Sequence, residues 1–180
     1  MAVIRAHEFI SLDGVFESPS WTMEFGFDPR MGETIGSLTG DAGAILLGRT
    51  TYEMFAPAWR DRSPEDDPGA PFFNDTEKLV VGGQPLAEEW ANTTALGAYD
   101  TAALRELKDS REGAIYVSGS GRLVRGLLAD GLLDELHLFV FPIALGAGDR
   151  LFAEGSTSFT VQATDVYDNG VVHQSLVPKA

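Results

Sequence analysis

Two glycine-bearing segments have the composition of a phosphate-binding turn. The first is Gly48-Arg49-Thr50-Thr51, which follows a short apolar run, and the second is Ser118-Gly119-Ser120-Gly121-Arg122-Leu123. A helix that begins directly after a buried strand presents free N–H groups and a partial positive charge, and both favour an anion. Glycine lets a ligand approach the backbone closely, and Arg49 and Arg122 can donate to phosphate oxygens. Each segment is therefore a candidate site for the phosphates of a nucleotide.

Both segments also have a purely structural interpretation. Thr50, followed three residues later by Glu53, matches a capping box, which completes a helix N-terminus without any ligand. The second segment can be an ordinary turn between a strand and a helix. It is not a Rossmann fingerprint, because Val124 stands where the third glycine belongs. The second segment thus favours a dinucleotide site in a different fold.

A third candidate, Ser11-Leu12-Asp13-Gly14, directly follows the first predicted strand. Open α/β sheets bind their ligands at polar loops beyond the carboxyl ends of the strands. The aromatic residues Trp21, Phe25 and Phe27 come next and can wall a flat heterocycle. The alternatives are a simple Asp-Gly turn and aromatic side chains that pack in the core.

The remaining polar residues show no familiar catalytic spacing. His7, His137 and His173 lack the spacing of metal ligands, so we interpret them as structural or surface residues and predict no metal site. The glycine loop at 142–152 needs no chemistry to explain it. Nucleophile elbows, P-loops and H-E-x-x-H motifs are absent from the sequence, and so is cysteine, which leaves hydrolases and thiol enzymes without machinery.

The elements that position these segments alternate between strand and helix. Helices are expected from Pro29 to about Leu38, from Thr50 to about Ala56, from a cap at Asp100 to about Asp109, and over 121–129. Asp28 is the expected cap of the first helix, and 61–71 is an expected surface loop. Strands are expected at 3–10, 44–47, 79–81, 93–96, 114–117, 136–141, 159–166 and 171–177.

This alternation predicts an α/β fold with a mixed, mostly parallel sheet of about eight strands and helices on both faces. Asn169-Gly170 between the last two strands predicts a C-terminal β-hairpin. The length of 180 residues suits a single domain over 1–180.

Composition narrows the partners. The formal net charge is −14, which disfavours nucleic acid and anionic membranes as partners. No apolar run is long enough to span a bilayer, and residues 1–9 lack the pattern of a secretory signal. We therefore expect a cytoplasmic protein that binds a small molecule.

Together these segments resemble one family. S-L-D-G at 11–14, L-L-G-R-T-T-Y-E at 46–53, V-S-G-S-G-R-L at 117–123 and P-x-x-L-G-x-G-x-x-L-F at 142–152 look like the reductase domain of riboflavin biosynthesis. That domain shares the three-layer dihydrofolate-reductase fold. The resemblance spans about residues 3–177 and is to a stand-alone member, without the deaminase half.

The resemblance implies NADPH as hydride donor, a pyrimidine- or pterin-type substrate and a homodimer. It assigns Asp13 and Glu33 to catalysis, the latter because dihydrofolate reductases carry a carboxylate on the first helix. Val81-Gly82-Gly83 departs from the serine-bearing turn of relatives. A non-catalytic module that kept the fold and a flavin-dependent reductase are the alternatives. The implied substrate contacts are Ser11, Trp21, Phe25 and Tyr52, and the implied cofactor contacts are Gly14, Gly48, Arg49, Thr50, Thr51, Ser118, Gly119, Ser120, Gly121, Arg122 and Leu123.

Overall fold

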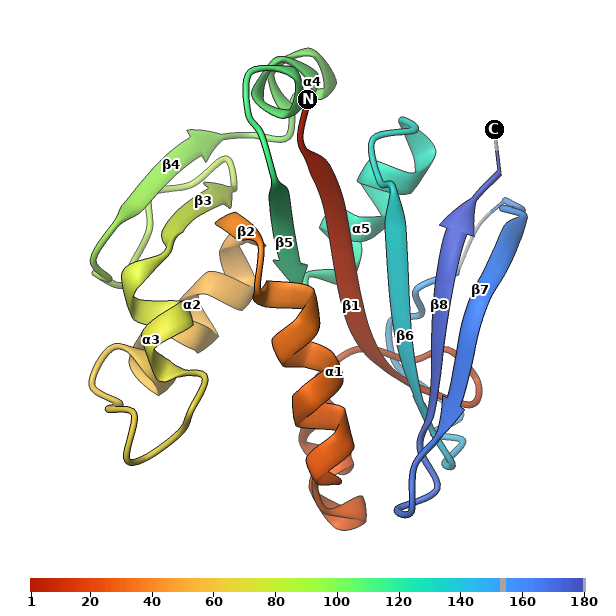
Figure 1. The fold of residues 1–180 in the computed structure, drawn as a ribbon. Helices are drawn as coiled ribbons and strands as arrows, with labels where there is room; N and C mark the ends of the chain where they lie inside the picture. The colour runs from red at the N-terminus through yellow and green to blue at the C-terminus, as the bar shows by residue number, and fades with distance from the viewer. Residues whose placement is uncertain (153–154, 180) are drawn as a thin grey trace.

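Eight strands form one twisted, mixed sheet in the computed structural model, which describes residues 1–152 and 155–179 (Figure 1). The strand order is β4-β3-β2-β5-β1-β6-β8-β7, and every pair from β4 to β6 is parallel. β8 runs antiparallel to both β6 and β7, so the predicted mixed sheet with a C-terminal hairpin is confirmed. The strands are β1 (Val3–Ser11), β2 (Ala42–Gly48), β3 (Glu77–Val81), β4 (Thr93–Gly97), β5 (Ala114–Ser118), β6 (Glu135–Phe141), β7 (Phe159–Val166) and β8 (Val172–Pro178).

Helices cover both faces of the sheet, as predicted. Side chains of α4 and α5 join one apolar cluster with alternate residues of β1, whereas α1, α2 and α3 pack on the other face. In Figure 1, α1 stands in front of the sheet and α5 lies behind it. Among the described residues, no helix has the length and apolar character needed to cross a membrane. The helices are α1 (Pro29–Thr39), α2 (Arg49–Trp59), α3 (Ala70–Asp75), α4 (Thr101–Asp109), α5 (Gly121–Ala129) and the 3-10 helix η1 (Pro19–Phe25).

Side-chain caps fix the starts of α1 and α4 where the sequence predicted them. The Asp28 carboxylate accepts a hydrogen bond from the Arg30 N–H at 2.8 Å, and Pro29 follows the cap. The Asp100 carboxylate accepts from the Ala103 N–H at 3.0 Å. Each cap satisfies an N–H that the helix itself leaves free.

The helix after β2 departs from the prediction. It begins at Arg49 rather than Thr50 and continues through Pro57 to Trp59. Gly48 is the N-cap and no side chain caps the helix, so the predicted capping box of Thr50 and Glu53 is wrong. Glu53 instead pairs with Arg49, one helical turn away.

Two short helices were not predicted. The expected loop over 61–71 ends in α3, which begins at Ala70. Its N-cap, Gly69, has no side-chain oxygen to signal a start, and the helix is held by burial of Ala70 and Phe73. η1 follows the left-handed residue Ser18, with φ of 46°, and it likewise lacks a side-chain cap. Each helix has a proline in its first turn, Pro19 and Pro71, but neither start has a side-chain cap to mark it.

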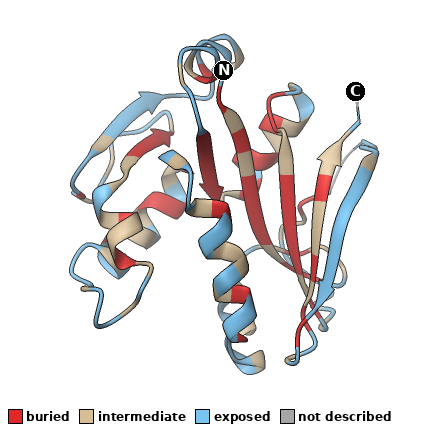
Figure 2. Cartoon of the chain, in the orientation of Figure 1, coloured by how far each residue is buried: buried red, intermediate tan, exposed pale blue. Residues whose placement is uncertain are grey.

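Burial follows the sheet. β5 is buried along its whole length, as a central parallel strand must be, while β7 at the far edge is almost entirely exposed (Figure 2). The hairpin turn is closed by a hydrogen bond from the Tyr167 N–H to the Val171 carbonyl at 2.9 Å, with Gly170 at φ of 83°.

One carboxyl group lies inside the apolar layer beneath α5. Glu8 is 2% exposed and sits between Ala6 and Ile10 on the sheet face that carries the α4–α5 cluster. Its Oε1 has no hydrogen-bond partner among the described residues. Burial raises the pKa of Glu8 to about 8, so the folded protein holds this carboxyl protonated at neutral pH.

We predict that Glu8 makes the protein less stable as pH rises. The unfolded chain releases this proton near pH 4.5 and the folded chain only near pH 8, so the free energy of unfolding falls with pH between these values. The slope reaches about 1.4 kcal/mol per pH unit. Buried histidines act in the opposite direction below pH 6.5, and Lys78, whose pKa burial lowers to about 8, does so near and above pH 8, so urea unfolding is best measured from pH 6.5 to 7.5. Glu8→Gln should flatten the decline; an equal decline in the variant would contradict the prediction.

Candidate functional site

The two glycine turns meet in space. β2 and β5 are neighbours in the sheet, so the residues that follow them lie side by side. The Gly48 N–H donates to the Ser120 Oγ at 2.9 Å. A Cβ on Gly119 would stand 3.7 Å from the Thr51 Cγ2, an ordinary contact distance. The structure therefore places the two predicted phosphate-binding segments at one location.

The N-termini of α2 and α5 open at this location without side-chain caps. α2 follows Gly48 and α5 follows Ser120, and neither residue caps its helix through a side chain. Gly119 and Ser120 both adopt left-handed backbone conformations, with φ of 59° and 68°. Free N–H groups at two converging helix starts, beside a glycine-bearing turn, form the arrangement that accepts phosphate oxygens.

The two arginines of the turns already have internal partners. Arg49 Nη1 lies 2.8 Å from the Glu53 Oε1, and Arg122 Nε lies 3.1 Å from the Asp149 Oδ2. The Arg122 side chain is nonetheless 79% exposed. Because a guanidinium has five N–H donors, each arginine keeps donors for a phosphate, while part of its charge is balanced in advance.

The turn at Val81-Gly82-Gly83 makes room for Arg49. A Cβ on Gly82 would lie 2.6 Å from the Cβ of Arg49, closer than real Cβ atoms approach. Gly83 is less constrained, since the nearest atom to its added Cβ would be the Ala98 Cβ at 3.7 Å. The glycine that departs from the family pattern thus lets Arg49 lie against the end of β3.

Asp13 holds two loops together. Its carboxylate accepts hydrogen bonds from the Ser11 hydroxyl at 2.6 Å and from the N–H groups of Leu145 and Gly146 at 3.0 and 2.8 Å. Arg150 Nη2 approaches it at 3.2 Å. The Ser11 hydroxyl and then these backbone N–H groups lower the pKa of Asp13 well below its ordinary value. A carboxylate that stays ionised does not deliver a proton, so these contacts favour a positioning role for Asp13.

The loop after β6 is the partner that sequence reasoning left without a role. The Leu12 N–H donates to the Ile143 carbonyl at 2.7 Å, and the Leu151 N–H donates to the Gly14 carbonyl at 2.9 Å. Gly14 itself has φ of 80°, which suits glycine. Through these bonds the first and last predicted motifs form one structural unit.

The same unit reaches the second glycine turn. A Cβ on Gly121 would lie 2.6 Å from the Phe16 ring, so Phe16 packs directly on the first residue of α5. Arg122 and Arg125 of α5 both bind Asp149 in the loop after β6. The loops after β1, β2, β5 and β6 therefore meet at one edge of the sheet.

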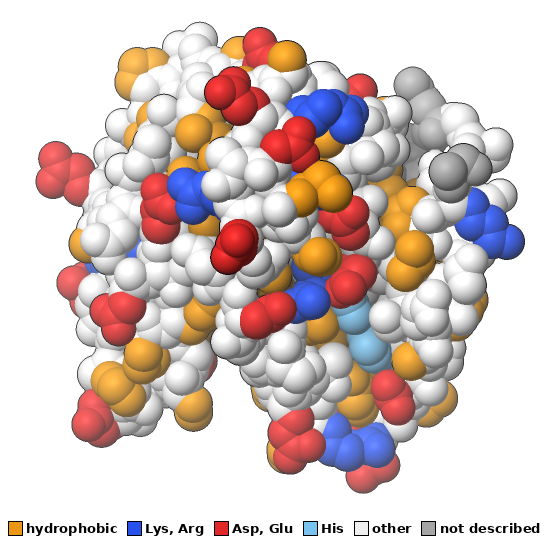
Figure 3. Space-filling model, turned by 45° about the horizontal axis from the view of Figure 1, so that its top comes forward, with side chains coloured by type: hydrophobic (Ala, Val, Ile, Leu, Met, Phe, Trp, Pro, Cys, Tyr) orange, Lys and Arg blue, Asp and Glu red, His pale blue; other side chains and the backbone are white. Residues whose placement is uncertain are grey.

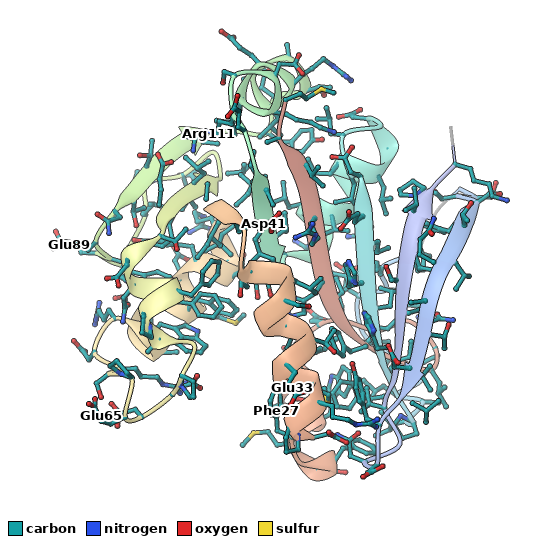
Figure 4. All side chains as sticks on the ribbon, in the orientation of Figure 1. Phe27, Glu33, Asp41, Glu65, Glu89 and Arg111 are labelled. Atoms are coloured by element: carbon teal, nitrogen blue, oxygen red, sulfur yellow. The ribbon has the colours of Figure 1, made fainter. Side chains whose placement is uncertain are left out.

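Four residues predicted to act in catalysis or substrate binding have other surroundings in the structure. Glu33 is exposed at mid-length of α1 (Figure 4). Trp21 and Phe25 pack edge-on against Phe141, with ring centroids 5.5 and 5.6 Å apart. Tyr52 is 1% exposed and its hydroxyl donates to the Glu88 carbonyl at 3.1 Å, so it belongs to the core beneath α2.

A buried polar pair that the sequence did not reveal adjoins the second turn. Tyr116 Oη and His7 Nδ1 are 2.6 Å apart, and the rings stack. The Gly119 N–H donates to the His7 carbonyl at 3.1 Å, which ties the pair to the glycine turn. Burial lowers the pKa of His7 to about 3 and raises that of Tyr116, so both are neutral near pH 7. Nothing in the sequence pairs residues 7 and 116 before β1 and β5 are known to be neighbours.

The other two histidines form a separate buried pair. His137 Nδ1 and His173 Nε2 lie 3.0 Å apart on β6 and β8, with parallel rings. Both side chains are less than a tenth exposed. Burial lowers the pKa of each, so this pair too is neutral near pH 7.

The family model described as the RibD C-terminal domain matches residues 2–173. The uncharacterized protein YwjB of Bacillus subtilis (strain 168) is 26% identical over 171 residues, which cover 90% of each chain.

Two solved structures show the same fold. A protein provisionally assigned to riboflavin biosynthesis, from Shewanella sp. PV-4, superposes with a TM-score of 0.79 at 20% identity and full coverage of both chains. Dihydrofolate reductase from Enterococcus faecalis, complexed with NADP(H) and RAB-propyl, gives 0.64 at 14% identity, covering 99% of this chain and 97% of that one. The predicted dihydrofolate-reductase-like fold is therefore confirmed.

We expect Gly82→Ala to destabilise the protein by about 1–3 kcal/mol, because the added methyl overlaps the Arg49 Cβ, which cannot move without the helix backbone. Gly83→Ala is the matched control, since its methyl meets only an ordinary contact. Thermal and urea unfolding of both variants measure the difference. Equal stability of the two would show that Arg49 is not held against Gly82.

Asp13→Asn should lower the melting temperature, because it replaces an ionised acceptor of several hydrogen bonds by a neutral amide that also brings unpaired donors. Asp61→Asn is the control, as the Asp61 side chain is 89% exposed. A melting temperature for Asp13→Asn no lower than that of the control would contradict the anchoring role of Asp13.

Proposed function

We propose, from the premise that this chain belongs to the RibD C-terminal domain family, that it is an NADPH-dependent reductase which transfers hydride to a pyrimidine- or pterin-type heterocycle. That family consists of NADPH-dependent reductases. The proposed reaction resembles those of two enzymes, the 5-amino-6-(5-phosphoribosylamino)uracil reductase of riboflavin biosynthesis and dihydrofolate reductase.

The observation that carries the proposal is the meeting of two uncapped helix N-termini at the Gly48–Ser120 hydrogen bond. A dinucleotide has two phosphates joined in a pyrophosphate, and two adjacent helix starts can receive them together. Gly119 and Ser120 both adopt left-handed conformations at the start of α5, and backbone turns of this kind can present N–H groups to an anion. The residues present therefore fit the cofactor.

Each segment has a defined part in this arrangement. Gly48, Thr50 and Thr51 would border the phosphates from the side of α2, and Ser118 to Leu123 would hold the pyrophosphate from the side of α5. Arg49 and Arg122 would share their remaining N–H donors with phosphate oxygens. The bound cofactor supplies the hydride.

The substrate side is formed by the loop that Asp13 organises. Ser11 and Asp13 bond to each other, and the Ser11 hydroxyl also accepts from the Val15 N–H at 2.9 Å, so the first turn of the loop is rigid. Rigid loops beside a cofactor position a substrate without an entropic penalty at each turnover. Figure 3 shows a deep notch in the molecule on the side where α1 and the α2–α3 region stand apart, and a flat heterocycle would enter there.

Cofactor binding tests the proposal directly. NADPH should quench tryptophan fluorescence with saturation below millimolar concentration, and Gly48→Ala should raise the dissociation constant at least about tenfold, because its methyl fills the space between the two turns. Gly48 has φ of −74°, so alanine fits the backbone there. Gly43→Ala is the control on the same strand, since no atom lies within 4 Å of its added Cβ.

Turnover is then followed at 340 nm with pterin and pyrimidine substrates. Oxidation of NADPH that depends on one of them supports a reductase. Tight binding without turnover of either class would favour the alternative of a non-catalytic nucleotide-binding module. Failure to bind NADPH or NADH at millimolar concentration would end the proposal.

A further inference from the structure

The His7–Tyr116 pair interrupts an otherwise apolar sheet face. Tyr116 belongs to the cluster beneath α2 and α3, which includes Phe72. His7 meets Phe9 and Phe139 of the cluster beneath α1 edge-on, with ring centroids 5.2 and 5.9 Å apart. The pair therefore lies where the two apolar clusters of this face adjoin.

The buried hydroxyl fixes the position of the imidazole proton. Tyr116 is 0% exposed, and its hydroxyl lies 2.6 Å from His7 Nδ1. The Ser118 hydroxyl, whose hydrogen bond lowers the pKa of Tyr116, acts as a donor to the same oxygen, which leaves His7 Nδ1 as the acceptor. A buried O–H without an acceptor costs about 1–3 kcal/mol, so the hydroxyl donates to Nδ1. In a neutral imidazole the other nitrogen then carries the hydrogen, which makes Nε2 a donor.

This donor is not consumed inside the protein. His7 Nε2 makes no hydrogen bond to any described residue. It is also not among the fully buried polar atoms without a partner, which are Glu8 Oε1, Thr93 Oγ1 and His137 Nε2. With His7 7% exposed, its free N–H is therefore not fully enclosed by the described chain.

We propose that His7 Nε2–H binds an uncharged hydrogen-bond acceptor of the substrate, a ring carbonyl oxygen or an unprotonated ring nitrogen, and that Tyr116 is the positioning residue that sets this tautomer. The proposal rests on the proposed function and gives the substrate a chemical class. A neutral donor in an apolar setting selects a neutral acceptor, since a buried carboxylate or ammonium would lack a counter-charge there.

The tautomer can be measured without any ligand. Histidine side-chain ¹⁵N correlation spectra should show His7 with the hydrogen on Nε2 and no titration between pH 5 and 9. Tyr116→Phe should release this constraint and give a mixture of tautomers. The opposite tautomer in the wild-type protein would overturn the proposal. The His137 and His173 signals are internal controls, because Tyr116→Phe should leave their tautomers unchanged.

Binding is tested on the complex with NADP⁺, which cannot turn over, using 5,6-diaminouracil and 6-hydroxymethylpterin as probes. At least one probe should shift the His7 Nε2–H signal. The double variant His7→Phe with Tyr116→Phe, which leaves no hydroxyl unpaired, should raise that probe's dissociation constant about tenfold and leave that of NADP⁺ within twofold. His7→Gln, whose amide nitrogen reaches about as far as Nε2, should restore most of the affinity.

The outcomes separate the two proposals. Absence of NADP⁺ binding refutes the proposed function. Normal NADP⁺ binding, with neither probe shifting His7 or with equal probe affinity in the double variant, refutes the role of His7 and leaves the proposed function intact.

Discussion

The hydrogen bond from the Gly48 N–H to the Ser120 hydroxyl joins the starts of two helices, and the rest of the site is arranged around it. It exists because β2 and β5 are parallel neighbours that end at the same edge of the sheet. Ser120 makes the bond from a left-handed conformation that costs a non-glycine residue about 1–3 kcal/mol. The strained residue lies where α2 and α5 expose their N–H groups, and these groups would bind an anion there.

An acidic protein can attract an anion only through local groups, and at this site these are backbone dipoles and two arginines that are partly balanced by carboxylates. Arg49 is paired with Glu53 one turn along the same helix, and Arg122 shares Asp149 with Arg125, so both arginine charges are partly balanced. Attraction must then come mainly from the helix N-termini, whose dipoles act only within the first turn. The overall charge of −14 therefore does not conflict with a phosphate site, because its repulsion is long-range and screened by salt.

The sequence predicted the elements whose signals are local. Asp28 and Asp100 correctly predicted the starts of α1 and α4, and the Asn-Gly pair predicted the hairpin. Caps and turns are predictable because they depend on a few neighbouring residues. It failed where stabilisation is tertiary. α3 begins at Ala70, after a glycine N-cap, and is held by burial. Glu53 pairs with Arg49 instead of completing a cap with Thr50, because α2 starts at Arg49, one residue earlier than expected.

For the candidate site, the sequence predicted the individual motifs but not the contacts between them. The four loops that meet at the sheet edge were each recognised from glycines and short polar runs. Their contacts were not, since Asp13 reaches across more than a hundred residues to the N–H groups of Leu145 and Gly146. The His7–Tyr116 pair had no signal, because a histidine inside a strand has the same local pattern whether its partner is a tyrosine or solvent.

Two neighbouring residues of β1 show that burial has different consequences on the two faces of the sheet. Glu8 and His7 point to opposite faces, and burial shifts their pKa values in opposite directions, so that both are uncharged near pH 7. Beneath α5 the neutral carboxyl has one oxygen without a partner and lies in a closed apolar layer, where it only costs stability as pH rises. On the other face the neutral imidazole is held by Tyr116 and keeps an N–H that is not fully enclosed. The same physical effect, loss of solvation, yields a stability liability on one face and a usable hydrogen-bond donor on the other.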